Sequence, residues 1–200
     1  MRVQWLLVVV FGVLVSGCVT SPPRQIDNIC DIFDEKSGWY DDAKEASDRW
    51  GVSIPVMMAI IYQESRFQPK AKPPRTKILW IFPGPRKSSA YGFAQAKDET
   101  WDWYKDQAGS WGADRDDFAD AVDFVGWYSH VSNKRSKISK NDPYRLYLAY
   151  HEGHGGYNRG TYRKKPWLQS VAKKVSSRAA IYQRQLVKCE ERLQGGWWFF

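Results

Sequence analysis

The chain is poor in the side chains that most often bind metal ions. It holds only three histidines and three cysteines among 200 residues. His151 and His154 stand three apart, whereas the zinc-protease helix motif needs two histidines four apart, and position 155 is glycine. The third histidine, His130, adds no such pattern. We therefore expect no metal site and no cofactor.

The apolar run at the N-terminus is too short to span a bilayer comfortably. It extends from Trp5 to Val15 after the single charge of Arg2, which is the length of a signal-peptide core. Residues 15–18 (Val-Ser-Gly-Cys) resemble the bacterial lipobox, whose cysteine is lipidated and begins the mature chain. This pattern predicts a signal peptide over residues 1–17 and a lipidated Cys18 on a tether over residues 18–27.

Export has consequences for location and for the other two cysteines. Val19 rather than aspartate follows Cys18, which in such lipoproteins favours a periplasmic protein anchored to the outer membrane. A plain secretory signal or an uncleaved anchor remains the alternative. In an oxidising compartment, Cys30 and Cys189 are expected to pair and to close a long loop, although two buried free thiols are also possible.

No internal repeat is found, and no alternation of apolar and polar residues is long enough for a sheet core. The chain therefore predicts a mainly α-helical fold with one domain over residues 28–194 and an aromatic tail over 195–200. Helix signals cover residues 37–50, 53–65, 98–107, 116–133, 142–152 and 166–193. The proline-rich segment 70–89 excludes a regular helix and could hold a short β-ribbon.

The mature chain is basic and rich in tryptophan. Without Arg2 it has 29 basic and 22 acidic residues, so its formal charge is about +7. Such a charge points to an acidic partner, namely nucleic acid, lipid headgroups or an anionic wall polymer, and export argues against nucleic acid. Of the 11 tryptophans, most should fill the core and a minority could stack on sugar rings.

Glu64 occupies an unusual position for a carboxylate. Val56, Ile60 and Glu64 fall four apart on one face of a short helix that Ser53 can cap and Pro69 ends. Burial and the negative end of the helix both raise the pKa of such a group, as a general acid near neutral pH requires. A buried glutamate paired with a nearby cation is the structural alternative.

Three segments resemble motifs of one family, the soluble-type lytic transglycosylases and goose-type lysozymes. They are Glu64-Ser65, Gly92-Phe93-Ala94-Gln95 and the run 149–155 (Ala-Tyr-His-Glu-Gly-His-Gly). Their order and their placement at helix ends extend the resemblance over about residues 52–160. It implies a single lysozyme-like helical domain of the goose-type (SLT) kind that cleaves the β-1,4 bond between the alternating sugars of peptidoglycan.

The resemblance also implies a mechanism and a set of site residues. Glu64 would protonate the glycosidic oxygen and then, as a carboxylate, take the proton of the muramic C6 hydroxyl, so that a 1,6-anhydro sugar forms without water. Substrate-binding or positioning roles would fall on Ser65, Gly92, Phe93, Gln95, Tyr150, His151 and, more weakly, Asp123. Ser65 could instead only cap its helix, and Gln95 could instead only order its loop.

Some features depart from the family pattern and leave other functions open. His151 replaces the motif asparagine, and the gap between Glu64 and Gly92 is about a dozen residues longer than expected. A lysozyme-type hydrolase would need a second carboxylate, for which Asp116, Asp117, Asp120 and Glu152 are candidates. A wall-binding lipoprotein without activity is the third possibility.

The additional segment is itself a candidate for substrate binding. Residues 72–87 carry five cations and no acidic residue, with Trp80 and Phe82 among them. Because the segment starts just after the Glu64 helix and leads into Gly92, we expect it to form one wall of the glycan groove, with Trp80 on a sugar. The alternative is that residues 78–82 cover the core or dock on a partner. The expected partners are thus peptidoglycan strands and, through the lipid, the membrane.

Overall fold

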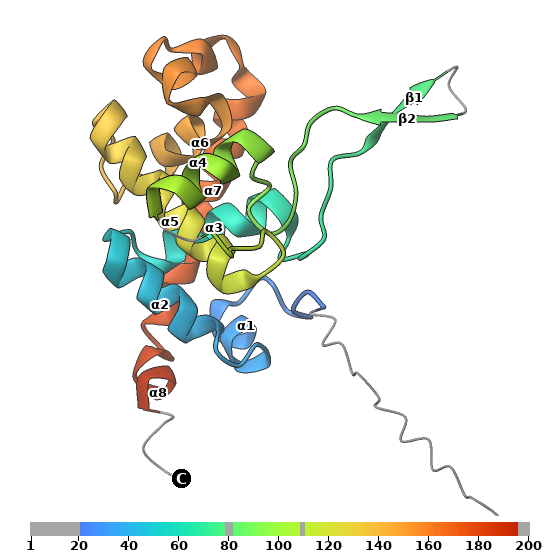
Figure 1. Ribbon diagram of the computed structural model, residues 1–200. Coiled ribbons are helices and arrows are strands. Elements are labelled where there is room, and N and C mark those ends of the chain that lie inside the picture. The colour runs from blue at the N-terminus through green and yellow to red at the C-terminus, as the bar shows by residue number, and fades with distance from the viewer. Residues whose placement is uncertain (1–20, 79–81, 109–110, 196–200) are drawn as a thin grey trace, which may run out of the picture.

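The computed structural model describes residues 21–78, 82–108 and 111–195. Within them the chain is mainly helical with one small two-stranded sheet, as predicted (Figure 1). The elements are α1 (Ile29–Glu35), α2 (Trp39–Trp50), α3 (Ile54–Ser65), β1 (Arg75–Ile78), β2 (Phe82–Arg86), α4 (Asp98–Ala108), α5 (Phe118–Ser136), α6 (Pro143–Asn158), η1 (Thr161–Lys164), α7 (Pro166–Leu186) and α8 (Glu190–Gly195). The expectations for residues 1–17, Cys18, Trp80 and residues 196–200 lie outside the described residues.

Helix α3 lies in the middle of the hydrophobic core. Every residue from Ile54 to Ile61 is buried, because all sides of this part of the helix are apolar and find apolar neighbours. Helix α7 packs along α3, and α5 contacts α3, α2 and α6. The last turn of α3 carries Glu64 and Ser65 to the edge of this core.

The helix ends lie close to the predicted residues, but not all the caps are the predicted ones. Asp117 and Asp142 cap α5 and α6 with their carboxylates, each accepting a backbone N–H. Ser53 occupies the N-cap position of α3, yet its hydroxyl makes no capping hydrogen bond. Helix α2 starts after Gly38, whose backbone is left-handed (φ 88°) and which supplies no side-chain cap.

Helices α6 and α7 end differently from the prediction. At Gly153 the backbone leaves helical geometry (φ 70°, ψ 158°), as the glycine-rich run predicted, but α6 then resumes to Asn158. Helix α7 ends at Leu186 rather than near residue 193, and the short helix α8 follows from Glu190. The turn between α7 and α8 positions Cys189.

Cys30 and Cys189 form a disulfide, as expected for the two leftover cysteines. Their Cα atoms are 6.1 Å apart, and the bond joins α1 to the turn after α7 across a sequence separation of 159 residues. The two ends of the domain are therefore covalently tied. Because the bond closes nearly the whole folded chain, it restricts the unfolded state strongly.

Strands β1 and β2 form a hairpin that projects from the helical body (Figure 1). They pair antiparallel, with Arg75 opposite Arg86 and Ile78 opposite Phe82. We call residues 72–89 the arm. The cations of its strands, Arg75, Lys77 and Arg86, are exposed. The described strands thus pair with each other, and none of their residues is among those that line the cleft described below.

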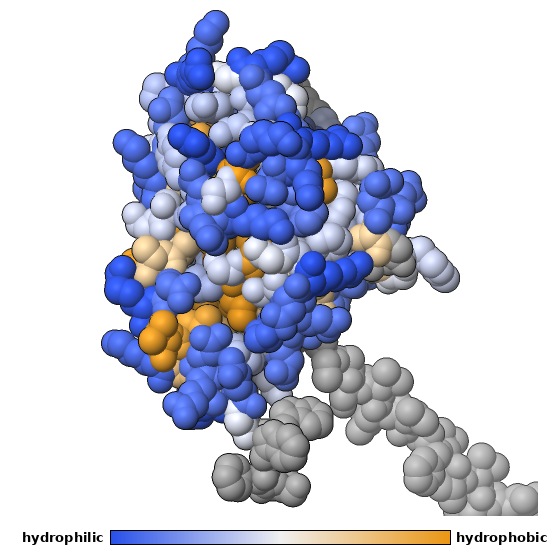
Figure 2. All heavy atoms as spheres, turned by 90° about the vertical axis from the view of Figure 1, so that its left-hand side faces the viewer, coloured by the Kyte–Doolittle hydropathy of each residue, from blue (hydrophilic) through white to orange (hydrophobic). Residues whose placement is uncertain are grey.

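The face of the molecule on the left-hand side of Figure 1 is largely polar. Figure 2 shows mainly hydrophilic residues on this face, with apolar residues visible only in small areas between them. In the described ranges, no helix combines the length and the apolar character needed to cross a bilayer. The long apolar segments, such as α3, are instead covered by neighbouring helices.

Candidate active site

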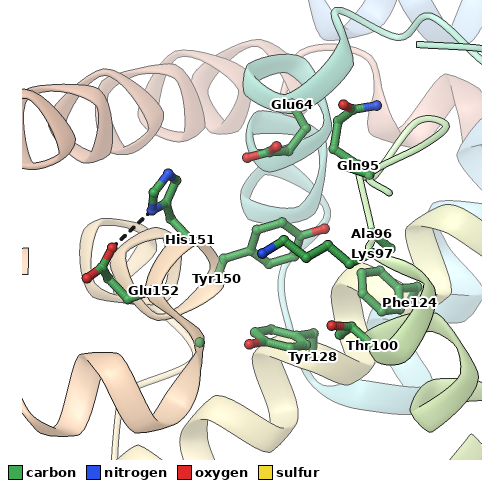
Figure 3. Close-up of a pocket in the computed structure, with 12 residues that line it drawn as sticks. Glu64, Gln95, Ala96, Lys97, Thr100, Phe124, Tyr128, Tyr150, His151 and Glu152 are labelled. Carbon is green, nitrogen blue, oxygen red and sulfur yellow. Dashed lines mark hydrogen bonds and ion pairs between the residues drawn. The ribbon is translucent and has the colours of Figure 1, made fainter. Parts of the chain in front are cut away.

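A cleft of about 380 Å³ opens where the end of α3, the segment before α4, helix α5 and helix α6 meet (Figure 3). Glu64 lies in it, opposite Tyr150 and beside Gln95. The full lining is Glu64, Ala90, Gln95, Ala96, Lys97, Thr100, Phe124, Tyr128, Tyr150, His151, Glu152 and Gly153. The three segments that carry the sequence motifs therefore converge on one cavity.

Glu64 is a carboxylic acid that is partly protonated near neutral pH. Burial raises its pKa from 4.5 to about 7, and a hydrogen bond donated by the Tyr147 hydroxyl opposes this rise only in part. No cation pairs with it among the described residues, so the structural alternative of a buried ion pair does not apply. An acid of this kind can both give and take a proton at the pH of most cells.

Tyr147 also contacts the acid, and it was not among the residues predicted from the sequence. It is buried on α6, three positions before Tyr150, so the two rings share a face of the helix. Burial and the nearby Glu64 charge both raise the pKa of Tyr147, which keeps its phenol protonated and able to donate. The spacing of three tyrosines at 144, 147 and 150 was the available signal.

Tyr150 lines the cleft, but its hydroxyl is engaged elsewhere. It donates to the backbone carbonyl of Ala94 at 2.6 Å. Its ring lies below Glu64 in Figure 3, and burial together with the Glu64 charge raises the pKa of Tyr150 well above its usual value. Tyr150 therefore holds the loop of residues 92–95 against α6 and supplies a wall of the cleft.

Gln95 closes the same loop from the other side. Its Nε2 donates to the carbonyls of Ala71 and Gly92, both at 2.9 Å, and its backbone is left-handed (φ 49°). The side chain thus ties the segment after α3 to the loop before α4. Of the two roles considered for Gln95, this geometry supplies the ordering of the loop, and the side chain also lines the cleft.

Gly92 is required by a close approach of the protein backbone. Its φ is +77°, and a Cβ at this position would lie 1.9 Å from the carbonyl oxygen of Arg115. The neighbouring Phe93 N–H donates to that same carbonyl at 3.1 Å. Gly92 therefore locks the motif loop onto the segment before α5.

Three further residues named from the sequence lie outside the cleft lining. Ser65 is buried, and its hydroxyl donates to the Ile61 carbonyl one turn earlier in α3. This hydroxyl therefore bonds within its own helix and not to Glu64. Phe93 packs in the core, edge-on to Trp39. Asp123 accepts hydrogen bonds from Trp50 (2.7 Å) and Tyr104 (2.7 Å) in a different hollow of the surface.

His151 and Glu152 form the far rim of the cleft. His151 Nδ1 is 3.1 Å from Glu152 Oε1, and Lys165 donates to the same oxygen at 2.7 Å. Burial alone would raise the pKa of Glu152, but hydrogen bonds from Lys165, Thr161 and His151 outweigh it and lower the pKa to about 2. Glu152 is therefore an ionised structural carboxylate that ties α6 to η1 and α7.

The other acids considered for a hydrolase are also occupied. Asp117 caps α5, Asp116 accepts from the Tyr91 hydroxyl at 2.9 Å, and Asp120 accepts from the Asp114 N–H at 2.8 Å. None of them lines the cleft. Over the described ranges, no group of three metal-binding side chains occurs either. Glu64 is thus the one acid of the described cleft that is not held by a cation.

The family comparison agrees with this geometry. A family model described as the transglycosylase SLT domain matches residues 6–189. No curated protein matches the chain. The matched range includes the three motif segments and every helix that lines the cleft. On this match, the chain belongs to the transglycosylase SLT domain family.

Proposed function

We propose that this protein is a peptidoglycan lytic transglycosylase that cleaves the β-1,4 bond from N-acetylmuramic acid to N-acetylglucosamine, with Glu64 as its acid and base. Family membership supports lytic transglycosylase activity on peptidoglycan. The observation that carries the finer proposal is Glu64 itself. Its pKa of about 7 suits both proton transfers, and no cation holds its carboxylate among the described residues.

In the proposed reaction, Glu64 both donates and accepts a proton, so that it returns to its starting state. Protonated Glu64 donates to the glycosidic oxygen as the bond from that oxygen to muramic C1 breaks. The Glu64 carboxylate then accepts the proton of the C6 hydroxyl, whose oxygen closes onto C1. Glu64 ends protonated, and no water is consumed. Tyr147 donates to the carboxylate between the two transfers, when a charge in the cleft most needs a partner.

The cleft favours this scheme over hydrolysis by two carboxylates. The second carboxylate of its lining, Glu152, is bonded to Lys165, His151 and Thr161. A base that activates water needs a carboxylate free to accept a proton, and a pKa of about 2 makes Glu152 a weak base.

The test is the chemistry of the products. Protein lacking residues 1–17 is incubated with purified peptidoglycan, and the fragments are analysed by mass spectrometry. From the native protein we expect fragments whose ends are one water lighter than reducing ends, as in a 1,6-anhydro sugar. In Glu64→Gln the rate of their formation should fall by at least about 100-fold. Glu99→Gln, an exposed residue of α4, is the matched control. Reducing ends would show hydrolysis instead. The absence of any fragments would overturn the enzyme assignment.

We further propose that Cys18 carries a lipid that anchors the protein in the periplasm, on the outer membrane. The supporting observation is the sequence of residues 15–19, with valine after the cysteine. Expressed with its full N-terminus, the native protein should fractionate with outer membranes, and Cys18→Ala should fractionate with the soluble periplasm. Membrane retention of Cys18→Ala after a high-salt wash would contradict the anchor.

A further inference from the structure

The chain concentrates positive charge next to the cleft. From Ser65 to Lys97 there are 33 residues without a single aspartate or glutamate, although the whole chain has 22. The same stretch holds eight basic residues: Arg66, Lys70, Lys72, Arg75, Lys77, Arg86, Lys87 and Lys97. It includes the arm and both of its connections to the helical body. A local field of one sign favours an anionic ligand there.

A groove lies at the root of the arm, where its two connections meet the helical body. Lys72, Arg86, Ser88, Tyr91 and Arg115 contribute to its lining. The Lys72 ammonium lies 5.0 Å from the centre of the Tyr91 ring, and Arg86 donates to the Pro73 carbonyl, so both cations have defined positions.

These two cations have no carboxylate partner within the part of the chain that the structure describes. The groove contains one carboxylate, Asp98, which is 2.8 Å from Arg115 and therefore already paired. Arg115 also donates to the carbonyls of Ser89 and Ala96. Lys72 and Arg86 are thus available to an incoming anion, whereas Arg115 supports the wall.

The groove lies next to the cleft that holds Glu64. Ala90 lines both cavities. Lys97 also lines the cleft (Figure 3), and no ion pair is found for it among the described residues. One cation, Lys97, therefore lines the cleft, and two more, Lys72 and Arg86, line the neighbouring groove at the root of the arm. A ligand that fits this arrangement runs through the cleft and carries negative charge on a side branch.

We propose that the groove at the root of the arm binds the carboxylates of the peptide stem on the glycan strand in the cleft. The inference rests on the proposed function and adds a substrate preference to it. Peptide stems branch from the sugar backbone and carry free carboxylates, which matches a cationic groove that opens beside the cleft. Lys72 and Arg86 bind the stem, and Lys97 meets a carboxylate nearer the sugar.

The experiment compares two substrates that differ in charge only at their carboxyl groups. One is soluble glycan strands with tetrapeptide stems, and the other is the same strands with their carboxyl groups converted to amides. For native protein we expect a higher kcat/KM on the carboxylate form and a preference that declines with added salt. Lys72→Gln/Arg86→Gln should reduce that preference by roughly five- to tenfold, the effect of losing two partly exposed ion pairs.

Two further variants separate charge from folding. Arg184→Gln/Lys188→Gln removes the same charge from exposed positions at the end of α7 and should keep the native preference. Lys72→Arg/Arg86→Lys keeps both cations and should retain most of it. An equal kcat/KM of native protein on both substrates, or an unchanged preference in Lys72→Gln/Arg86→Gln, would overturn the proposal.

Calorimetry with Glu64→Gln protein tests the groove independently of catalysis. The proposal is supported if the carboxylate strands bind more tightly than the amide strands and if Lys72→Gln/Arg86→Gln removes this difference. That result would hold even if native protein formed no anhydro ends, because the absence of anhydro ends would overturn only the proposed reaction. If those substitutions instead abolish binding to vesicles containing phosphatidylglycerol and leave strand binding unchanged, the arm contacts a membrane and the stem proposal is wrong.

Discussion

Tyr147 donates a hydrogen bond to the carboxylate of Glu64, while Tyr150, one helical turn further along α6, donates to the Ala94 backbone. The two tyrosines thus divide two tasks. Tyr147 acts on the charge of the acid, and Tyr150 fixes the loop beside it. A hydrogen bond to the ionised form lowers the pKa of a carboxyl group, so Tyr147 limits the rise that burial causes at Glu64.

Replacing Tyr147 by phenylalanine should therefore raise the pKa of Glu64 further, by about one unit. General acid catalysis needs the protonated form, so the alkaline limb of the kcat/KM profile should move to higher pH. The maximal rate should fall, because the intermediate carboxylate loses its donor. The measurement is the pH profile on soluble glycan strands. Tyr144→Phe, on the same helix but outside the cleft, is the control, and an unshifted limb in Tyr147→Phe would contradict the assigned contact.

Glu64 should make the stability of the fold depend on pH. Its folded-state pKa is raised from 4.5 to about 7, so folding favours the protonated form, and stability is lost as pH rises through this range. In Glu64→Gln this loss is absent. The variant should exceed native protein in unfolding free energy by about 3 kcal/mol above pH 8 and by little near pH 4. Urea unfolding from pH 4 to pH 8 measures this difference, with Glu99→Gln as control. If the unfolding free energies of native protein and Glu64→Gln changed in parallel with pH, the pKa of Glu64 would not be raised by folding.

Gly92→Ala should disrupt the motif loop. The left-handed backbone alone costs an alanine about 1–2 kcal/mol, and the new Cβ would also collide with the Arg115 carbonyl at 1.9 Å. Gly38→Ala is a matched control, because Gly38 has a similar φ of +88° and no atom within 4 Å of the added Cβ. In urea unfolding, Gly92→Ala should lose about 1–3 kcal/mol more than Gly38→Ala. Equal losses would show that the loop can move away from Arg115.

The disulfide should stabilise the domain without contributing to the cleft. In the chain-entropy model, a loop of 159 residues corresponds to at most about 5 kcal/mol. Cys30→Ala/Cys189→Ala should therefore unfold at lower urea concentration and still cleave peptidoglycan at temperatures where it is folded. Thiol titration of the unreduced, denatured native protein should find neither cysteine free. Two free thiols, or unchanged stability in the double variant, would contradict this.

Much of the fold was readable from local pattern. The positions of α2, α4 and α5 and the place where α6 is interrupted follow from apolar periodicity, from Asp117 and Asp142 as caps, and from Gly153. Prolines predicted the interruption after α3, where the arm is found. Glu64 was recognisable because a carboxylate on an apolar helix face is rare and its helix ends soon after it. Such signals lie within one segment and do not depend on how the segments pack.

Other features depend on contacts between segments far apart in the sequence. Gly92 is needed because the Arg115 carbonyl occupies its Cβ position, and Tyr147 reaches Glu64 across the interface of two helices. Periodicity places Tyr147 and Tyr150 on one helix face but cannot say which hydroxyl meets the acid. The arm shows the same limit, since its sequence allows strands yet does not say whether they pair with the body or with each other. These choices follow from steric fit and hydrogen-bond geometry, which exist only once the helices have packed.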